Sequence, residues 1–323
     1  MGSNTVEMQP TRDAYGHEIL RLGLENPDIY VIDCDISLSC KTVEFSKRLP
    51  QQHINVGIAE QNACGIAAGF AACGKIPFVT SYAVFCSMRM LEQVRQSVCY
   101  PNLNVKIAGS HGGLTAANDG ATHQGIEDMG ILRSLPNMTV VCGCDYNSSL
   151  KLVRAAAKWK GPVYIRFTRD AVPVIYDEET DFEIGKANTI RTGADVCIFA
   201  NGSIMSVALE GAELLEQNGI STRLLDMHTI KPLDVEAVIK AVNEVGRIIT
   251  IEDHSIINGL GSAICEVVAE QGCGKVHRIG IQDCYGESAP YEKLLEKNNI
   301  TSQNILESAI KLMRVNAQER KFH

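Results

Sequence analysis

Short apolar runs alternate with longer helical stretches through the first half of the chain. Six runs rich in β-branched residues are apolar without a polar–apolar alternation: 29–33, 54–57, 77–83, 104–109, 138–142 and 161–167. Strands of this kind are typical of a sheet that is buried on both faces. The pattern therefore predicts a doubly wound α/β domain, in which helices cover both sides of a parallel sheet.

The same alternation returns after a polar stretch. Residues 176–193 carry acids and glycine without a helical period, which predicts a linker. Beyond it, the pattern predicts strands over 194–202, 221–232 and 247–255, with helices over 206–219, 235–246 and 262–272. The length of 323 residues also exceeds the ~100–200 typical of one domain. We expect two α/β domains, 1–187 and 188–323.

Composition narrows the class of protein. Apolar residues make up 45% and charged residues 21% of the chain, as in an ordinary globular protein. The net charge of −8, without a block of Lys and Arg, argues against a nucleic-acid partner. No apolar run approaches the ~20 residues that span a bilayer, and residues 1–13 lack the pattern of a signal peptide. We expect a cytoplasmic protein with no membrane segment.

Cysteine usage agrees with that expectation. The twelve cysteines form no C-x-x-C pair, and most lie in apolar runs such as 64–73. Buried free thiols in a reducing compartment are favoured over disulfides or a metal site.

Three segments that follow predicted strands carry chemically useful side chains. In open α/β sheets, ligands bind beyond the carboxyl ends of the strands. The segments are 33–39, 57–62 and 109–124, and the last is too long to be an ordinary connection. Asp119 followed by glycine resembles a diphosphate and metal motif, but about ten small or polar residues separate it from its strand. We therefore predict no metal site on this chain.

Four motifs occur in a recognisable order: "INVGIAEQN", "TSYAVFCSMR", "SHGGLTAANDGATHQGIEDMGILRSLPNM" and "IRFTRDAVPV". Together they resemble the C-terminal half of transketolase, from about Thr11 to the end. The resemblance implies a pyrimidine-binding domain, a transketolase C-terminal domain and the cofactor thiamine diphosphate. The family's N-terminal domain, which holds the cofactor diphosphate and its Mg²⁺ or Ca²⁺, is expected on a partner subunit. We expect a heterotetramer of the two subunits acting on sugar phosphates.

The resemblance assigns roles around the cofactor. Glu60 matches the catalytic glutamate, whose hydrogen bond to ring N1′ of the aminopyrimidine favours the imino tautomer that takes the C2 proton. Tyr82 and Phe85 match the aromatic wall of the pyrimidine pocket, and Asp35 matches an aspartate near the thiazolium. Met88 stands where many transketolases have a third aromatic residue. From the residues alone, Glu60 also suits the first turn of a helix, where a carboxylate is stabilised.

Substrate contacts are implied in the same way. His111 and His123 match residues that bind sugar hydroxyls and assist proton transfer, and Asp119 matches a reader of hydroxyl groups. Arg12, Ser39 and Arg169 match the phosphate-binding residues, and guanidinium groups suit phosphate oxygens. Structural histidines and solvated arginines remain the alternatives.

Three other functions stay open at this stage. The β subunits of 2-oxo acid dehydrogenases share the layout and the glutamate, and deoxyxylulose-phosphate synthase shares the "THQ" of 122–124. A non-catalytic scaffold that keeps the fold is the third. We assign no catalysis to His228, and the glycine pair at 259 and 261 lacks the rest of a dinucleotide fingerprint.

Overall fold

The computed structural model describes residues 7–319, with side chains to Arg314. The outermost residues of the two predicted domains, 1–6 and 320–323, lie outside the described residues.

A seven-stranded sheet forms the first half of the protein. Its order is β12-β6-β7-β5-β4-β2-β3, where β12 (Thr229–Lys231) comes from the second half of the chain, and every pair is parallel except β12 with β6. The strands of the first half are β2 (Ile29–Asp33), β3 (His53–Asn55), β4 (Ile76–Tyr82), β5 (Lys106–Ser110), β6 (Thr139–Cys142) and β7 (Val163–Arg166). All six apolar runs therefore form strands, and the predicted doubly wound architecture is confirmed.

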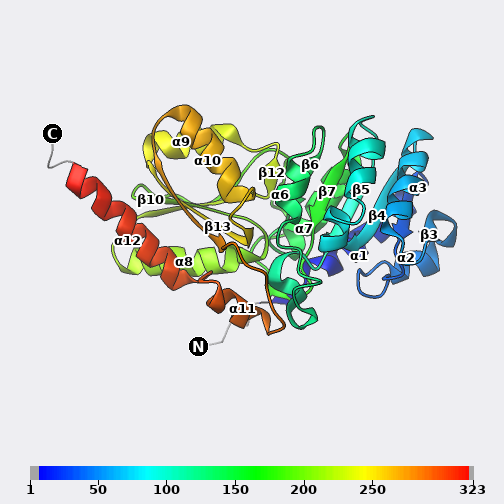
Figure 1. The fold of residues 1–323 in the computed structure, drawn as a ribbon, viewed down its shortest axis with the longest axis horizontal. Helices are drawn as coiled ribbons and strands as arrows, with labels where there is room; N and C mark the ends of the chain where they lie inside the picture. Colours follow the sequence, from blue (N-terminus) through cyan, green and yellow to red (C-terminus); the bar gives the residue numbers. More distant parts are fainter. Residues whose placement is uncertain (1–6, 320–323) are drawn as a thin grey trace.

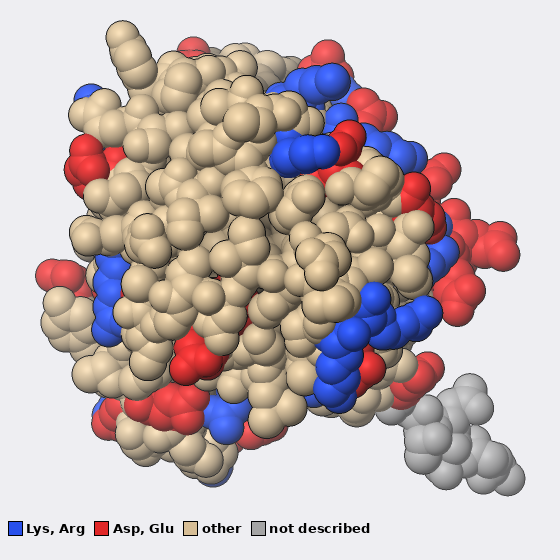
Figure 2. Space-filling view, turned by 90° about the vertical axis from the view of Figure 1, so that its right-hand side faces the viewer, with Lys and Arg blue, Asp and Glu red and all other residues tan. Residues whose placement is uncertain are grey.

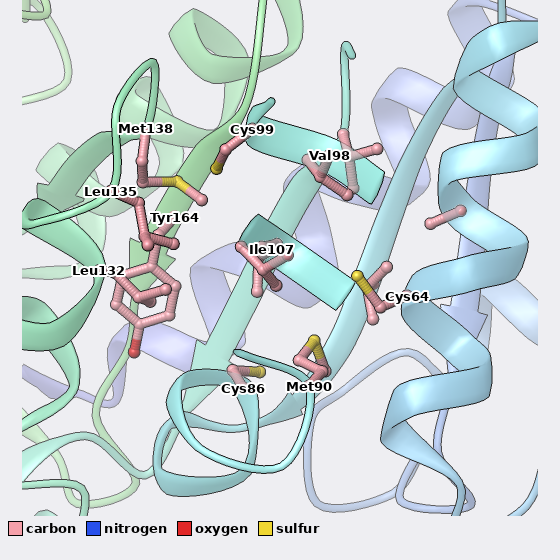
Figure 3. Packing of buried hydrophobic residues seen from close by; sticks show 14 of the residues in the cluster. Cys64, Cys86, Met90, Val98, Cys99, Ile107, Leu132, Leu135, Met138 and Tyr164 are labelled. Carbon is pink, nitrogen blue, oxygen red and sulfur yellow. The ribbon is translucent and has the colours of Figure 1, made fainter. Parts of the chain in front are cut away.

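Helices cover both faces of this sheet (Figure 1). One face carries α1 (Thr11–Glu25), α2 (Val43–Arg48) and α7 (Tyr146–Lys158); the other carries α3 (Glu60–Ala72), α6 (Asp128–Arg133) and the π-helical η2 (Val94–Cys99). Figure 3 shows Cys64 of α3 and Val98 of η2 packed near Ile107 of β5. The alanines of α3 let this helix lie close to the sheet, which fixes the position of its first residue.

Shorter elements connect these layers. They are β1 (Met8–Gln9), paired with β8 (Val172–Pro173), then η1 (Pro50–Gln52), α4 (Ala83–Ser87), α5 (Leu91–Gln93) and the 3₁₀ segment η3 (Gly113–Asp119).

The second half forms a five-stranded sheet of order β14-β13-β10-β11-β9. Its strands are β9 (Asn188–Arg191), β10 (Val196–Ala200), β11 (Thr222–Asp226), β13 (Arg247–Ser255) and β14 (Lys275–Ile281), of which only β9 is antiparallel among the described residues. On one face lie α8 (Met205–Gln217) and α12 (Ser302–Glu319), and on the other α9 (Val235–Glu244) and α10 (Leu260–Gln271). The short η4 (Gly202–Ile204) and α11 (Tyr291–Lys297) complete it.

Two predicted boundaries differ from the structure. The strand expected over 221–232 is two strands in two sheets, because β12 (Thr229–Lys231) leaves β11 and pairs with β6 of the first sheet. The polar stretch 176–193 contains β9, which covers the edge of β11. Both pairings are between distant segments, so local periodicity does not reveal them.

Most of the twelve cysteines are buried, and all twelve are free thiols. Burial raises the pKa of Cys64 to about 12, so this thiol is unreactive at neutral pH. No helix within residues 7–319 is both long and apolar enough to cross a bilayer.

Candidate functional site

Glu60 is the first residue of α3, at the carboxyl-terminal edge of the parallel sheet. The chain leaves β3, turns at Gly57 with a φ of +74°, and enters the helix at Glu60. The Glu60 side chain is only 5% exposed, which is unusual for an acidic residue. The predicted junction between an extended segment and a small-residue helix is confirmed, and it places one buried acid at the edge where ligands bind.

Arg89 is the partner of this acid. Its Nη1 donates a hydrogen bond of 3.1 Å to Oε1 of Glu60, and its guanidinium carbon lies 3.9 Å from the centre of the Phe85 ring. The Arg89 side chain itself is half exposed. A flat, hydrogen-bonding group is thus already seated between the carboxylate and the aromatic face.

Aromatic rings continue from Phe85 toward the two predicted histidines. Tyr82 stacks on Phe85 with centroids 5.9 Å apart, and it contacts the His111 ring at 4.1 Å. His123 meets Phe85 edge-on at 5.6 Å. The residues predicted to line the pyrimidine pocket and those predicted to read the sugar therefore form one continuous wall.

A polar cavity of about 440 Å³ opens at the end of this wall. It is lined by Arg12, Leu38, Ser39, Lys41, Tyr82, His111, Asp119 and Arg169. Six of these residues come from the predicted set and converge from five separate segments of the chain. Three cations face one carboxylate, so the cavity is locally positive although the protein carries a net charge of −8.

The cations of the cavity are held by short contacts. Arg12 donates to the backbone carbonyl of Ser39 at 3.0 Å, and its Nη1 lies 3.4 Å from Nε2 of His111. Arg169 donates to the carbonyl of Ala116 at 3.0 Å and forms an ion pair with Asp119 at 3.0 Å. Both guanidinium groups are therefore fixed before any ligand arrives.

His111 is buried and conformationally unusual. It has a φ of +60°, a region that residues other than glycine seldom adopt, and its Nδ1 lies 2.8 Å from the hydroxyl of Ser110. Burial and then the cations of Arg12 and Arg169 lower its pKa to about 3. The ring is neutral at cellular pH, so in this state it acts as a hydrogen-bonding group and not as a charged acid.

Asp35 lies apart from the polar cavity. It is exposed, with a φ of +65°, and accepts a hydrogen bond of 2.9 Å from Asn55, close to the turn that precedes Glu60. The neighbouring Asp33 is buried and holds the segment that carries Ser39. Burial alone would raise the pKa of Asp33, but hydrogen bonds from His53 and Thr42 outweigh it and the pKa is lowered.

Residues 7–174 match the family model of the transketolase pyrimidine binding domain, and residues 185–305 match that of the transketolase C-terminal domain. The chain belongs to the transketolase family. This confirms the resemblance in its motifs and the predicted fold.

Relatives of this transketolase-family chain include proteins that align with it over nearly their whole length. A putative transketolase C-terminal section from Methanocaldococcus jannaschii is 42% identical over 94% of this chain and 96% of the relative. A 6-deoxy-6-sulfo-D-fructose transketolase subunit, SqwH, from Clostridium sp. is 39% identical over 92% of each chain. A solved split-gene transketolase, described as an inactive β4 tetramer, has a TM-score of 0.87 with 42% identity, covering 94% of this chain and 98% of that one.

Two residues of the transketolase-family site were missed by sequence reasoning. Arg89 lies at the end of the recognised motif "TSYAVFCSMR", four residues after Phe85, which is one helical turn. Lys41 follows Ser39 closely and lines the polar cavity, where it pairs with Asp13 at 3.2 Å. The spacing of Arg89 from Phe85 could have predicted that the two side chains meet. The direction in which the Lys41 side chain points depends on its φ of +66°, which the sequence does not reveal.

Glu60 and Phe85 fit the aminopyrimidine of thiamine diphosphate. The guanidinium of Arg89 shows that a planar group fits over Phe85 and reaches the carboxylate at the same time. Among the described residues, no group of three or more His, Cys, Asp and Glu side chains has the arrangement of a metal site.

Proposed function

We propose that this chain is the pyrimidine-domain subunit of a two-subunit transketolase that depends on thiamine diphosphate. It would transfer a two-carbon ketol unit from a ketose phosphate to an aldose phosphate. The observation that carries the proposal is the continuity of the site along one sheet edge. The buried acid Glu60 is followed by the wall of Phe85 and Tyr82, and then by the polar cavity, called the cationic cavity below because of its three cations.

Each part of this edge has a chemical task. Glu60 would accept a hydrogen bond from, or share a proton with, the pyrimidine ring, while Phe85 stacks on that ring. When bound, thiamine diphosphate would supply a nucleophilic carbon and an acceptor for the electron pair of the C–C bond. His111 and His123 would bind the sugar oxygens beside this carbon, and Asp119 would accept hydrogen bonds from hydroxyl groups.

The cationic cavity suits the phosphate of the substrate. Arg12 and Arg169 present guanidinium donors from different segments, and Nε of Arg12 is a buried donor without a hydrogen-bond partner among the described residues. A phosphate oxygen would satisfy such donors and neutralise the surplus positive charge. Ser39 adds a hydroxyl at the rim of the same cavity.

A partner subunit would complete the site. Large apolar side chains are exposed around Glu60, among them Leu38 at 78%, Ile58 at 73% and Met88 at 44%. Figure 2 shows that uncharged residues cover the centre of the face at the β3 and α3 end of the molecule. Exposed apolar surface beside a site marks a contact region. A partner seated there would hold the cofactor diphosphate and Mg²⁺ or Ca²⁺, and two such pairs would form the heterotetramer.

The test is reconstitution. The chain is mixed with a purified transketolase N-terminal subunit, thiamine diphosphate and Mg²⁺, and ketol transfer is measured beside pyruvate decarboxylation. We expect transfer from a ketose phosphate only when both subunits are present; the related split-gene transketolase that was solved as a β4 tetramer is described as inactive. Transfer by the chain alone, or activity with pyruvate in place of the sugar phosphate, would contradict the proposal.

A further inference from the structure

The loop that carries Asp119 is held by hydrogen bonds to the second half of the protein, a half that lies outside the polar cavity. This loop, residues 112–120, includes η3 and lies beside α11 (Figure 1). Its backbone also supports Arg169, through the carbonyl of Ala116. Two residues of the cationic cavity thus depend on where the loop sits.

Asp253 of β13 holds the beginning of the loop. Both of its carboxylate oxygens accept the backbone N–H of Leu114, at 3.0 and 3.1 Å, and the carboxylate is only 2% exposed. Tyr291 of α11 donates to the same carboxylate at 3.1 Å. A hydrogen bond to a buried carboxylate is stronger than one between neutral groups, so this contact fixes the backbone firmly.

Close packing leaves the loop little freedom around Asp253. Gly113 has a φ of +62°, and a Cβ at this position would lie 2.3 Å from Oδ2 of Asp253. The loop backbone therefore lies so close to the Asp253 carboxylate that a side chain at position 113 would collide with it.

A second contact holds the end of the loop. Gln124 is 2% exposed, and its Nε2 donates to the carbonyl of Glu287 at 2.9 Å and to the carbonyl of Ala117 at 3.2 Å. The loop is thus held at both ends by the β13–α11 region. Asp119, which pairs with Arg169 at 3.0 Å, lies between Leu114 and Gln124 along the chain.

We propose that Asp253 is a positioning residue for sugar-phosphate binding, because it fixes the loop that carries Asp119 and supports Arg169 at the cavity. The inference rests on the proposed function for its substrate. It gives the second half of the chain a part in substrate recognition, although none of the described residues of this half lines the cavity.

The adjacent acid Glu252 offers a matched control. It is equally buried in β13, but its carboxylate accepts the backbone N–H groups of Leu260 and Gly261 at the start of α10, at 2.7 and 2.8 Å. The two acids lie in the same strand and removal of either carboxylate leaves backbone N–H donors unpaired, but of the two only Asp253 bonds to the loop.

The first experiment compares Asp253→Ala, Asp253→Asn and Glu252→Ala by hydrogen exchange of the full chain. We expect exchange of the 112–120 segment to accelerate about tenfold or more in Asp253→Ala and less in Asp253→Asn. In Glu252→Ala, exchange should accelerate at 259–262 instead. Unchanged exchange of 112–120 in both Asp253 variants would overturn the inference, whether or not the chain is a transketolase subunit.

The second experiment uses the reconstituted complex. We expect KM for a phosphorylated acceptor to rise about tenfold in the Asp253 variant that folds, with kcat changed by less than about threefold. Glu252→Ala should leave KM unchanged. An equal rise of KM in Glu252→Ala would overturn the inference, because it would show that Asp253 acts only through the general stability of the fold. A wild-type complex without ketol transfer would contradict the proposed function alone.

Discussion

Nη1 of Arg89 lies 3.1 Å from Oε1 of Glu60 while the Arg89 guanidinium lies over the ring of Phe85. The proposed function requires the same carboxylate oxygen and the same ring face for the aminopyrimidine. In the isolated subunit, Arg89 therefore occupies both the Glu60 carboxylate and the Phe85 ring face. Its side chain has to move when the cofactor binds.

Arg89→Met should strengthen cofactor binding. An ion pair near the surface is worth about 0.2–1 kcal/mol and an exposed cation–π contact about 0.5–1 kcal/mol, so the loss of both corresponds to roughly three- to thirtyfold. We expect the concentration of thiamine diphosphate that gives half-maximal activity of the reconstituted complex to fall by that factor. Arg95→Met, an exposed arginine further along the same segment, is the control. Weaker cofactor binding in Arg89→Met would mean that Arg89 holds the cofactor.

Arg12→Gln tests the phosphate contact. A hydrogen bond to a charged group is worth about 1.5–3 kcal/mol, so KM for a phosphorylated acceptor should rise about ten- to a hundredfold. With unphosphorylated glycolaldehyde as the acceptor, KM should change little. Arg21→Gln alters an exposed arginine of the same helix and should affect neither. Equal effects on both acceptors would place the phosphate elsewhere.

His111 should make stability depend on pH. Burial, Arg12 and Arg169 lower its pKa to about 3, while an unfolded histidine titrates near ~6.5. The unfolded chain binds more protons between these values, so the contribution of neutral His111 is complete above pH ~6.5 and is lost as the pH falls. The free energy of unfolding, measured by urea denaturation, should fall more steeply from pH 6.5 to 5 in the wild type than in His111→Gln.

The exposed His17 provides the comparison for that measurement. His17→Gln should keep the wild-type dependence on pH. Parallel curves for the wild type and His111→Gln would show that His111 takes up protons normally in the folded protein.

The parallel core was predictable because continuous apolar runs such as 29–33 report burial on both faces. The position of Glu60 was also readable, since a glycine turn and a helix of small residues follow one another in the sequence. The division of 221–232 between β11 and β12 was not, because the pairing of Thr229 with Val141 joins segments far apart along the chain.

The same limit applies to the site. His111, Asp119 and Arg169 were predicted because they lie in motifs that resemble those of transketolase. Asp253 was not, because its partner Leu114 is 139 residues away and the contact is made to a backbone N–H, which leaves no trace in side-chain types.

The most direct test of the account is Glu60→Gln in the reconstituted complex. Glutamine keeps the size and a hydrogen-bonding group but cannot share a proton with the pyrimidine, so the rate of ketol transfer should fall by about 10²–10⁴. Assembly and cofactor binding should persist, and Glu92→Gln, at an exposed acid nearby, should retain the full rate. A Glu60→Gln complex that transfers ketol units at the wild-type rate would contradict the account.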